Sequence, residues 1–117
     1  MVIEFSRHGT RAPLASYAGL GDLGVEPGSL LPEGYNEQFS IGQHINHTYP
    51  HLINPSTMSV RSSNFTRTID SAKAQLSGIF NTTEELIPIK VKAHDSDYLL
   101  KPDTCPGIWA DTHHLQN

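Results

Sequence analysis

Two helices are predicted by the spacing of hydrophobic residues along this chain of 117 residues. Five apolar positions between residues 64 and 80 are spaced four, three, four and three apart, which places them on one face of a helix. They are Phe65, Ile69, Ala72, Leu76 and Ile79. Ser62 or Ser63 is expected to cap this helix. A second helix is predicted over residues 34–48 and is expected to end at Pro50.

Three short runs of β-forming residues predict strands. Residues 2–6 contain Val2, Ile3 and Phe5 and predict a short buried strand, and residues 57–61 predict a second. Residues 87–92 predict a third, which Pro88 confines to the edge of a sheet. Together with the helices, this order predicts the α/β class, with a small parallel sheet flanked by helices.

The remaining segments carry no clear period. Residues 14–33 are rich in Gly and predict a long loop, and a loop of that length in a small domain is usually functional. Residues 93–117 show neither helical nor strand alternation. A chain of this length has room for one small domain, so residues 1–117 are treated as a single unit.

Composition narrows the classes of function. The chain contains twelve acidic and eight basic residues. The resulting formal net charge of −4 argues against a broad surface that binds nucleic acid. No run of 18 apolar residues is present, so no membrane span is expected. A single Cys excludes a disulfide framework within these residues.

Signals for the cellular compartment point in opposite directions. Met1 is followed directly by apolar residues without a basic segment, so no signal peptide is predicted, and a true start at Met1 implies the cytoplasm. Three glycosylation sequons begin at Asn46, Asn64 and Asn81, and they indicate a secreted or lysosomal protein whose leader is missing. Asn46 and Asn81 are the better candidates for glycosylation, because Asn64 lies beside the anion site argued next.

Four side chains predict an anion-binding site. Arg7, His8 and Arg11 follow the carboxyl end of the first predicted strand, and Arg61 ends the second. Ligands of parallel α/β sheets bind at the carboxyl ends of strands. Arginine forks bind phosphate oxygens in bidentate fashion, and an imidazole that faces a clamped phosphate is a candidate nucleophile. If the two strands are neighbours, the three guanidinium groups and the imidazole converge on one crevice.

The segment Arg7-His8-Gly9-Thr10-Arg11-Ala12-Pro13 resembles the RHGxRxP signature of the histidine acid phosphatases. Three further stretches are similar to the same family in the same order along residues 2–106. They are Leu31-Pro32-Glu33-Gly34-Tyr35, the block from Val60 to Ala72, and the stretch from Ile87 to Pro106. Phosphoglycerate mutases share Arg-His-Gly without the Arg-x-Pro continuation and fit less well. The resemblance implies that residues 1–117 form the amino-terminal part of one such domain, with its carboxy-terminal part absent.

The resemblance also implies an activity. Phosphomonoesters would be hydrolysed at acid pH, with His8 attacking phosphorus to form a phosphohistidine. Arg7, Arg11 and Arg61 would bind the substrate and hold the transferred oxygens. No metal or other cofactor is implied. Family members are often dimers, but the sequence shows no interface.

The family's proton donor is a later His followed by Asp, and these residues contain no clear counterpart. His94-Asp95 is rejected for that role because a dipeptide is weak evidence without its structural context. His44, His47 and His51 are rejected as a zinc site because Pro50 interrupts their helical spacing. Cys105 is either a free thiol or a small buried residue. The alternative to an enzyme is therefore a truncated, non-catalytic fragment that binds phosphate or has no function.

Overall fold

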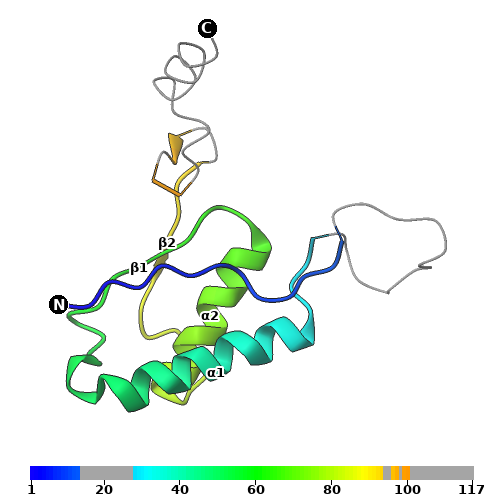
Figure 1. The fold of residues 1–117 in the computed structure, drawn as a ribbon. Coiled ribbons are helices and arrows are strands. Elements are labelled where there is room, and N and C mark those ends of the chain that lie inside the picture. Colours follow the sequence, from blue (N-terminus) through cyan, green and yellow to red (C-terminus); the bar gives the residue numbers. More distant parts are fainter. Residues whose placement is uncertain (14–27, 94–95, 98, 101–117) are drawn as a thin grey trace, which may run out of the picture.

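The computed structural model describes residues 1–13, 28–93, 96–97 and 99–100, and Figure 1 shows their arrangement. Two helices and a short parallel sheet form the structured part, which confirms the predicted α/β class. The elements are α1 (Pro32–Thr48), η1 (Pro50–Leu52), β1 (Val60–Arg61), α2 (Thr66–Phe80) and β2 (Ile89–Lys90). Within this described part, no helix is long and apolar enough to cross a membrane.

The sheet is a β–α–β unit in which α2 connects two parallel strands. Val60 pairs with Ile89, and Arg61 pairs with Lys90. The ladder continues one step further, because the amide of Ser62 donates to the carbonyl oxygen of Lys90 at 2.9 Å. Both strands lie inside the segments predicted from the sequence, but each covers only two residues. Pro88 has no N–H to donate, so pairing begins immediately after it.

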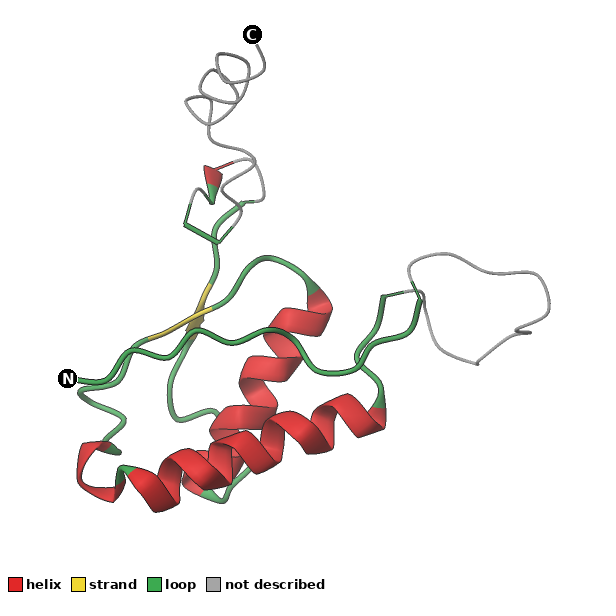
Figure 2. Cartoon of the chain, viewed as in Figure 1, coloured by secondary structure: helices red, strands yellow, loops and turns green. Residues whose placement is uncertain are grey.

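The buried strand predicted over residues 2–6 is wrong. Residues 1–9 carry no helix or strand assignment, and Figure 2 draws them as loop. Ile3 is 67% exposed and Phe5 is 78% exposed. The physical reason is the absence of a partner: no backbone hydrogen bond links residues 2–6 to any other described segment. A β-forming sequence becomes a strand only when another strand satisfies its backbone groups.

The helix predicted over residues 34–48 is confirmed, and it begins two residues earlier than expected. Pro32 occupies the first turn, where its missing N–H costs nothing and its fixed φ suits the helix. The helix ends at Thr48, and Pro50 then begins the short helix η1. The expectation that Pro50 ends the segment therefore holds.

The second predicted helix is also confirmed as α2, but its predicted cap is wrong. The N-cap position is Phe65, and no side chain caps the helix there. The hydroxyl of Ser62 donates to the carbonyl oxygen of Ser63 at 2.8 Å, and the hydroxyl of Ser63 donates to that of Thr68 at 3.0 Å. The helix starts two residues later than expected, so both serines lie too early to reach its first free amides.

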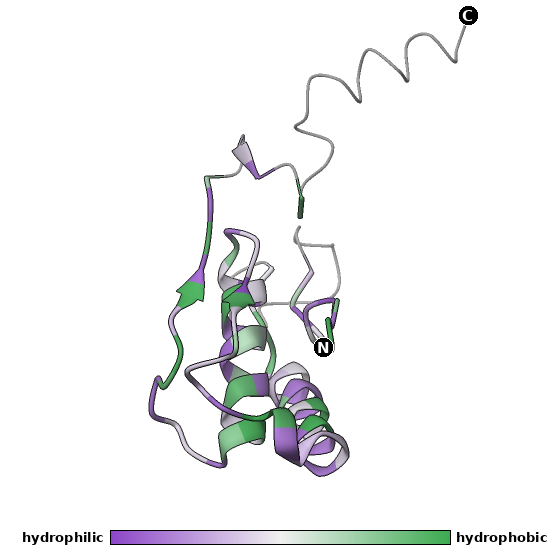
Figure 3. Cartoon of the chain, turned by 90° about the vertical axis from the view of Figure 1, so that its left-hand side faces the viewer, coloured by the Kyte–Doolittle hydropathy of each residue, from purple (hydrophilic) through white to green (hydrophobic). Residues whose placement is uncertain are grey.

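Small and polar residues form the contact between α1 and α2. The buried positions of α1 are Gly34, Gln38 and Gly42, and those of α2 include Ser71, Ala74, Gln75 and Gly78. A Cβ on Gly42 would collide with the carbonyl oxygen of Gln75, and one on Gly78 with that of Phe39. Figure 3 shows α1 nearly end-on beside α2, with hydrophobic and hydrophilic residues interleaved on both helices. The two backbones therefore approach closely.

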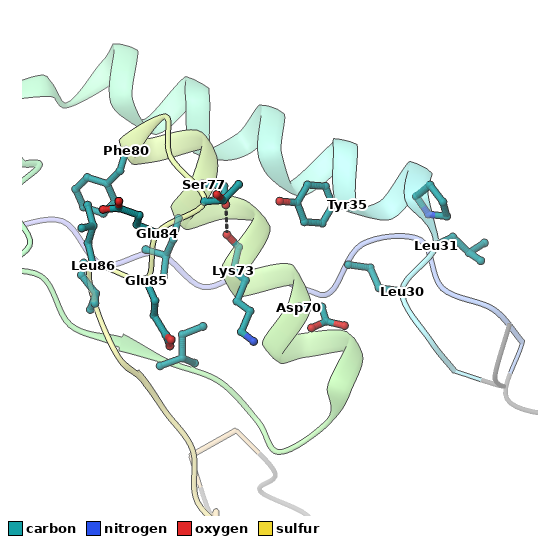
Figure 4. A pocket seen from close by; sticks show the side chains of 15 residues that line it. Leu30, Leu31, Tyr35, Asp70, Lys73, Ser77, Phe80, Glu84, Glu85 and Leu86 are labelled. Atoms are coloured by element: carbon teal, nitrogen blue, oxygen red, sulfur yellow. Dashed lines mark hydrogen bonds between the residues drawn. The ribbon is translucent and has the colours of Figure 1, made fainter.

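The apolar stripe predicted for α2 does not form the buried face as a whole. Ile79 is buried, but the other four residues of the stripe are only partly covered. Leu76 lines a groove of about 670 Å³ on α2, together with apolar residues from the start of α1 and from the segment that follows α2. In Figure 4, Tyr35, Leu30 and Leu31 lie towards one end of this groove, and Phe80 and Leu86 towards the other.

Candidate active site

The three motif side chains Arg7, His8 and Arg11 lie around one open hollow of about 440 Å³. Residues 7–11, Pro13 and Glu37 line it. His8 and Arg11 are partly buried, whereas Arg7 is exposed. The motif segment therefore places two guanidinium groups and one imidazole at the same place, without the strand that was expected to present them.

Side chains of both helices hold the first half of the motif. The amide of Gln75 donates to the hydroxyl of Ser6 at 2.9 Å and to the amide oxygen of Gln38 at 2.6 Å. Gln38 in turn donates to the carbonyl oxygen of Arg7 at 3.3 Å. The backbone N–H of Gly9 donates to the hydroxyl of Ser71 at 3.1 Å. These hydrogen bonds therefore hold the motif segment in place, a role that pairing with a neighbouring strand would otherwise have.

The second half of the motif is held by the chain that leads into α1. The amide of Ala12 donates to the carbonyl oxygen of Ser29 at 2.8 Å, and the amide of Leu31 donates to that of Thr10 at 2.9 Å. Arg11 and Leu30 form an antiparallel bridge. Residues 10–12 of the motif therefore pair with residues 29–31, which belong to the predicted loop over residues 14–33. Residues 14–27 of that loop lie outside the described residues.

Glycine is required where the motif meets α1. A Cβ on Gly9 would collide with the backbone of Gly34, and one on Gly34 would collide with the backbone of Thr10. Both glycines are buried. The motif segment consequently lies directly on the first turn of α1, closer than any larger residue would permit.

A hydrogen bond to its own backbone orients the ring of His8. Its Nδ1 lies 2.8 Å from the carbonyl oxygen of Gly9. A carbonyl oxygen can only accept, so Nδ1 carries the proton in this contact. In the neutral ring, Nε2 is then left with the lone pair.

Glu37 is a carboxylate at the hollow that the sequence did not single out. Its Oε1 accepts hydrogen bonds from the backbone N–H of Thr10, at 3.2 Å, and from the hydroxyl of the same residue. Glu37 is exposed and lies on α1, one helical turn after Gly34. It fixes the backbone between His8 and Arg11, and it adds a negative charge beside the two guanidinium groups.

Arg61 has a separate partner. It ends β1, as the sequence predicted, but it is not among the residues that line the hollow. Its Nη2 instead forms an ion pair with Oδ1 of Asp97, which lies after β2. Three of the four predicted site residues therefore line one hollow, and Arg61 is not part of that lining.

The two candidate glycosylation asparagines differ in their side-chain contacts. Nδ2 of Asn46 donates to the carbonyl oxygen of Ile79 at 2.5 Å, near the end of α2. Asn81 is exposed and adopts the left-handed backbone conformation directly after the same helix. The nitrogen to which a glycan would be attached is therefore engaged in Asn46.

Four residues that support the site were missed by sequence reasoning: Glu37, Gln38, Ser71 and Gln75. A signal was present in the spacing of Gly34, Gln38 and Gly42 at intervals of four, and of Ser71, Gln75 and the adjacent Ala74 and Gly78. Such rows of small and polar residues at helical spacing indicate a close helix contact. The apolar stripe predicted for α2 occupies other positions and therefore does not indicate this contact.

The remaining predicted residues are His94, Asp95, Cys105 and the histidines near the end of α1. His94, Asp95 and Cys105 lie outside the described residues. His44 is exposed on α1, and its Nε2 lies 3.4 Å from the hydroxyl of Thr48. Over residues 1–13 and 28–93 and the few described beyond them, no group of three or more His, Cys, Asp or Glu side chains could hold a metal ion.

Comparison with known proteins places these observations in a family. The family described as the histidine phosphatase superfamily (branch 2) matches residues 18–106. This match begins after residues 7–13, so it supports the family independently of the Arg-His-Gly motif.

Three curated proteins are similar to the chain. Testicular acid phosphatase of Mus musculus is 32% identical over 116 residues, covering 81% of this chain and 27% of the relative. The testicular acid phosphatase of Homo sapiens is 36% identical over 87 residues, covering 63% of this chain and 20% of the relative. Lysosomal acid phosphatase of Rattus norvegicus is 32% identical over 115 residues, covering 81% and 27%. The chain thus spans about a quarter of the length of these relatives.

Proposed function

Because the chain belongs to branch 2 of the histidine phosphatase superfamily, we propose that it forms the nucleophile-bearing part of an acid phosphatase. The observation that carries this proposal is the arrangement at the hollow. A histidine whose Nδ1 is bound to the carbonyl oxygen of Gly9 faces the same open space as Arg7 and Arg11.

The proposed reaction has two steps. Nε2 of His8 attacks the phosphorus of a phosphomonoester, so that an N–P bond forms while the bond to the ester oxygen breaks. Water then attacks the phosphohistidine and releases inorganic phosphate. Guanidinium groups stabilise the charge on the transferred oxygens, as electrostatic catalysis of phosphoryl transfer requires. The ester oxygen needs a proton as it leaves, which the family resemblance assigns to the later His-Asp pair.

Hydrolysis of p-nitrophenyl phosphate at acid pH tests this proposal. Replacing His8→Ala removes the nucleophile, and we expect kcat/KM to fall by at least about 10⁴-fold. His51→Ala is the matched control, because His51 is exposed on η1, and its removal should leave the rate unchanged. Trapping with labelled substrate should give a phosphoprotein that is labile to acid in the parent and absent in His8→Ala. Turnover that survives His8→Ala would refute the site.

A second candidate is a fragment that binds phosphate without turnover. The position of Arg61 favours it, because the observed hollow contains two of the three expected guanidinium groups. Titration with inorganic phosphate distinguishes the two candidates. Binding that is lost in Arg11→Ala, with no p-nitrophenyl phosphate hydrolysis in the parent, would favour the binding protein over the enzyme.

A further inference from the structure

Asp97 is the largest fully buried side chain in the described part of the molecule. It is 1% exposed, although the other buried residues of comparable or greater size are apolar or uncharged. Taking a carboxylate out of water is costly unless a charged or hydrogen-bonding partner compensates it. A buried Asp in so small a core therefore requires a specific partner.

That partner is Arg61. Oδ1 of Asp97 accepts from Nη2 of Arg61 and also from the backbone N–H of Leu100, at 3.3 Å. The second bond ties the carboxylate to the turn in which it lies. The first clamps one nitrogen of a guanidinium group that comes from a segment 36 residues earlier in the chain. The parallel pairing of Arg61 with Lys90 brings the two segments together.

The contact with Asp97, called the clamp below, engages only Nη2 of the Arg61 guanidinium group. The side chain of Arg61 is 28% exposed, so part of it remains open to solvent. Its Nε is buried and has no hydrogen-bond partner among the described residues, and the same holds for Oδ2 of Asp97. An arginine fork that is held at one nitrogen has fewer orientations available, and a restricted orientation favours bidentate recognition of a phosphoryl group.

We propose that Asp97 is a positioning residue that holds Arg61 through Nη2 and thereby orients the remaining N–H groups of Arg61 for a phosphoryl group. This proposal rests on the proposed function and extends it, because it adds Arg61, which does not line the hollow of Arg7, His8 and Arg11, to the groups that bind the phosphoryl oxygens. Asp97 itself contacts neither substrate nor the reacting atoms. It acts by restricting a long side chain that would otherwise sample many rotamers.

The first measurement examines the clamp without relying on activity. In ¹H–¹⁵N spectra of the full chain, a clamped Arg61 should give separate, slowly exchanging side-chain signals, assigned by their loss in Arg61→Lys. Asp97→Asn keeps the size and removes the charge, and it should collapse these signals to the averaged position of a freely rotating guanidinium group. Averaged signals in the parent chain would overturn the proposal, whether or not any variant folds.

The second measurement separates positioning from a merely structural role. Asp97→Asn should lower kcat for p-nitrophenyl phosphate by about 10- to 100-fold, with a smaller change in KM, because small misplacements of catalytic groups are costly in the transition state. Asp97→Glu, which retains the charge, should recover part of the loss. Asp70→Asn is the matched control on α2, and it should leave both constants unchanged.

The outcomes distinguish this proposal from the proposed function. A lower melting temperature in Asp97→Asn with unchanged kcat and KM would overturn positioning and leave a structural ion pair. A parent chain with clamped Arg61 signals but no turnover would favour the phosphate-binding fragment over the enzyme and, since the inference rests on the enzyme, would overturn the catalytic use of the clamp. Clamped signals together with a loss of kcat that Asp97→Glu rescues would support both.

Discussion

At the scale of single residues, Asn46 illustrates how one polar contact connects the two helices. Its side chain lies on α1, and Nδ2 donates to the carbonyl oxygen of Ile79 in the last turn of α2. The carbonyl groups of a last helical turn have no partner within the helix. Asn46 satisfies one of them from outside, so the residue that begins a glycosylation sequon also binds the end of the neighbouring helix.

Replacing Asn46→Ala should therefore lower the free energy of unfolding. The expected loss is about 1 kcal/mol, the usual contribution of one hydrogen bond to stability. Urea unfolding followed by circular dichroism measures it. Asn36→Ala is the matched control, because Asn36 is exposed on the same helix, and we expect a change within about 0.5 kcal/mol. Equal effects of the two substitutions would show that the contact with Ile79 contributes nothing.

Individual site residues could be predicted from the sequence to the extent that they are close together in it. Arg7, His8 and Arg11 lie within five positions, and the structure places them around one hollow. Arg61 was correctly placed at the end of a strand, but its partner Asp97 lies 36 residues later. No local pattern indicates a contact over that separation, because it depends on how β1 and β2 pair.

At the scale of elements, the crossing of α1 and α2 determines where the motif lies. Gly42 and Gly78 allow the two backbones to touch, and the Gln38–Gln75 contact beside them reaches Ser6 and Arg7. The helix spans were predictable because periodicity and proline positions are local signals. The buried face could not be predicted from the apolar residues, because two backbones in close contact require small residues at that face.

Gly42→Ala tests the crossing, because two effects predict opposite signs. Helix propensity alone would make Ala more stable by about 1 kcal/mol. A Cβ at this position collides with the carbonyl oxygen of Gln75, and forced overpacking costs about 1–3 kcal/mol, so we expect net destabilisation. Thermal unfolding measures the sign. Ser40→Ala, at an exposed position of α1, should be neutral or stabilising. Stabilisation by Gly42→Ala would contradict the close contact.

At the scale of the whole described molecule, little apolar surface is covered. The buried hydrophobic residues are Ala12, Ala74, Ile79 and Ile87, whereas Val2, Ile3 and Phe5 are at least half exposed. These three have the composition of a strand, and β1 and β2 form a sheet of only two short strands. Exposed β-forming residues beside a free sheet edge are a common route to association.

The amino-terminal residues should therefore drive self-association of the 117-residue chain. We expect the weight-average mass in sedimentation equilibrium to rise with concentration, and the double substitution Ile3→Thr and Phe5→Thr to reduce that rise. Leu52→Thr serves as the control, because Leu52 is also exposed, at 39%, but lies on η1 outside any strand-forming run. A parent chain that stays monomeric at all concentrations would contradict this prediction. Residues 2–6 combine exposure with strand-forming sequence and unpaired backbone groups, whereas Leu52 has exposure alone. A control that reduces association equally would therefore assign it to general hydrophobicity.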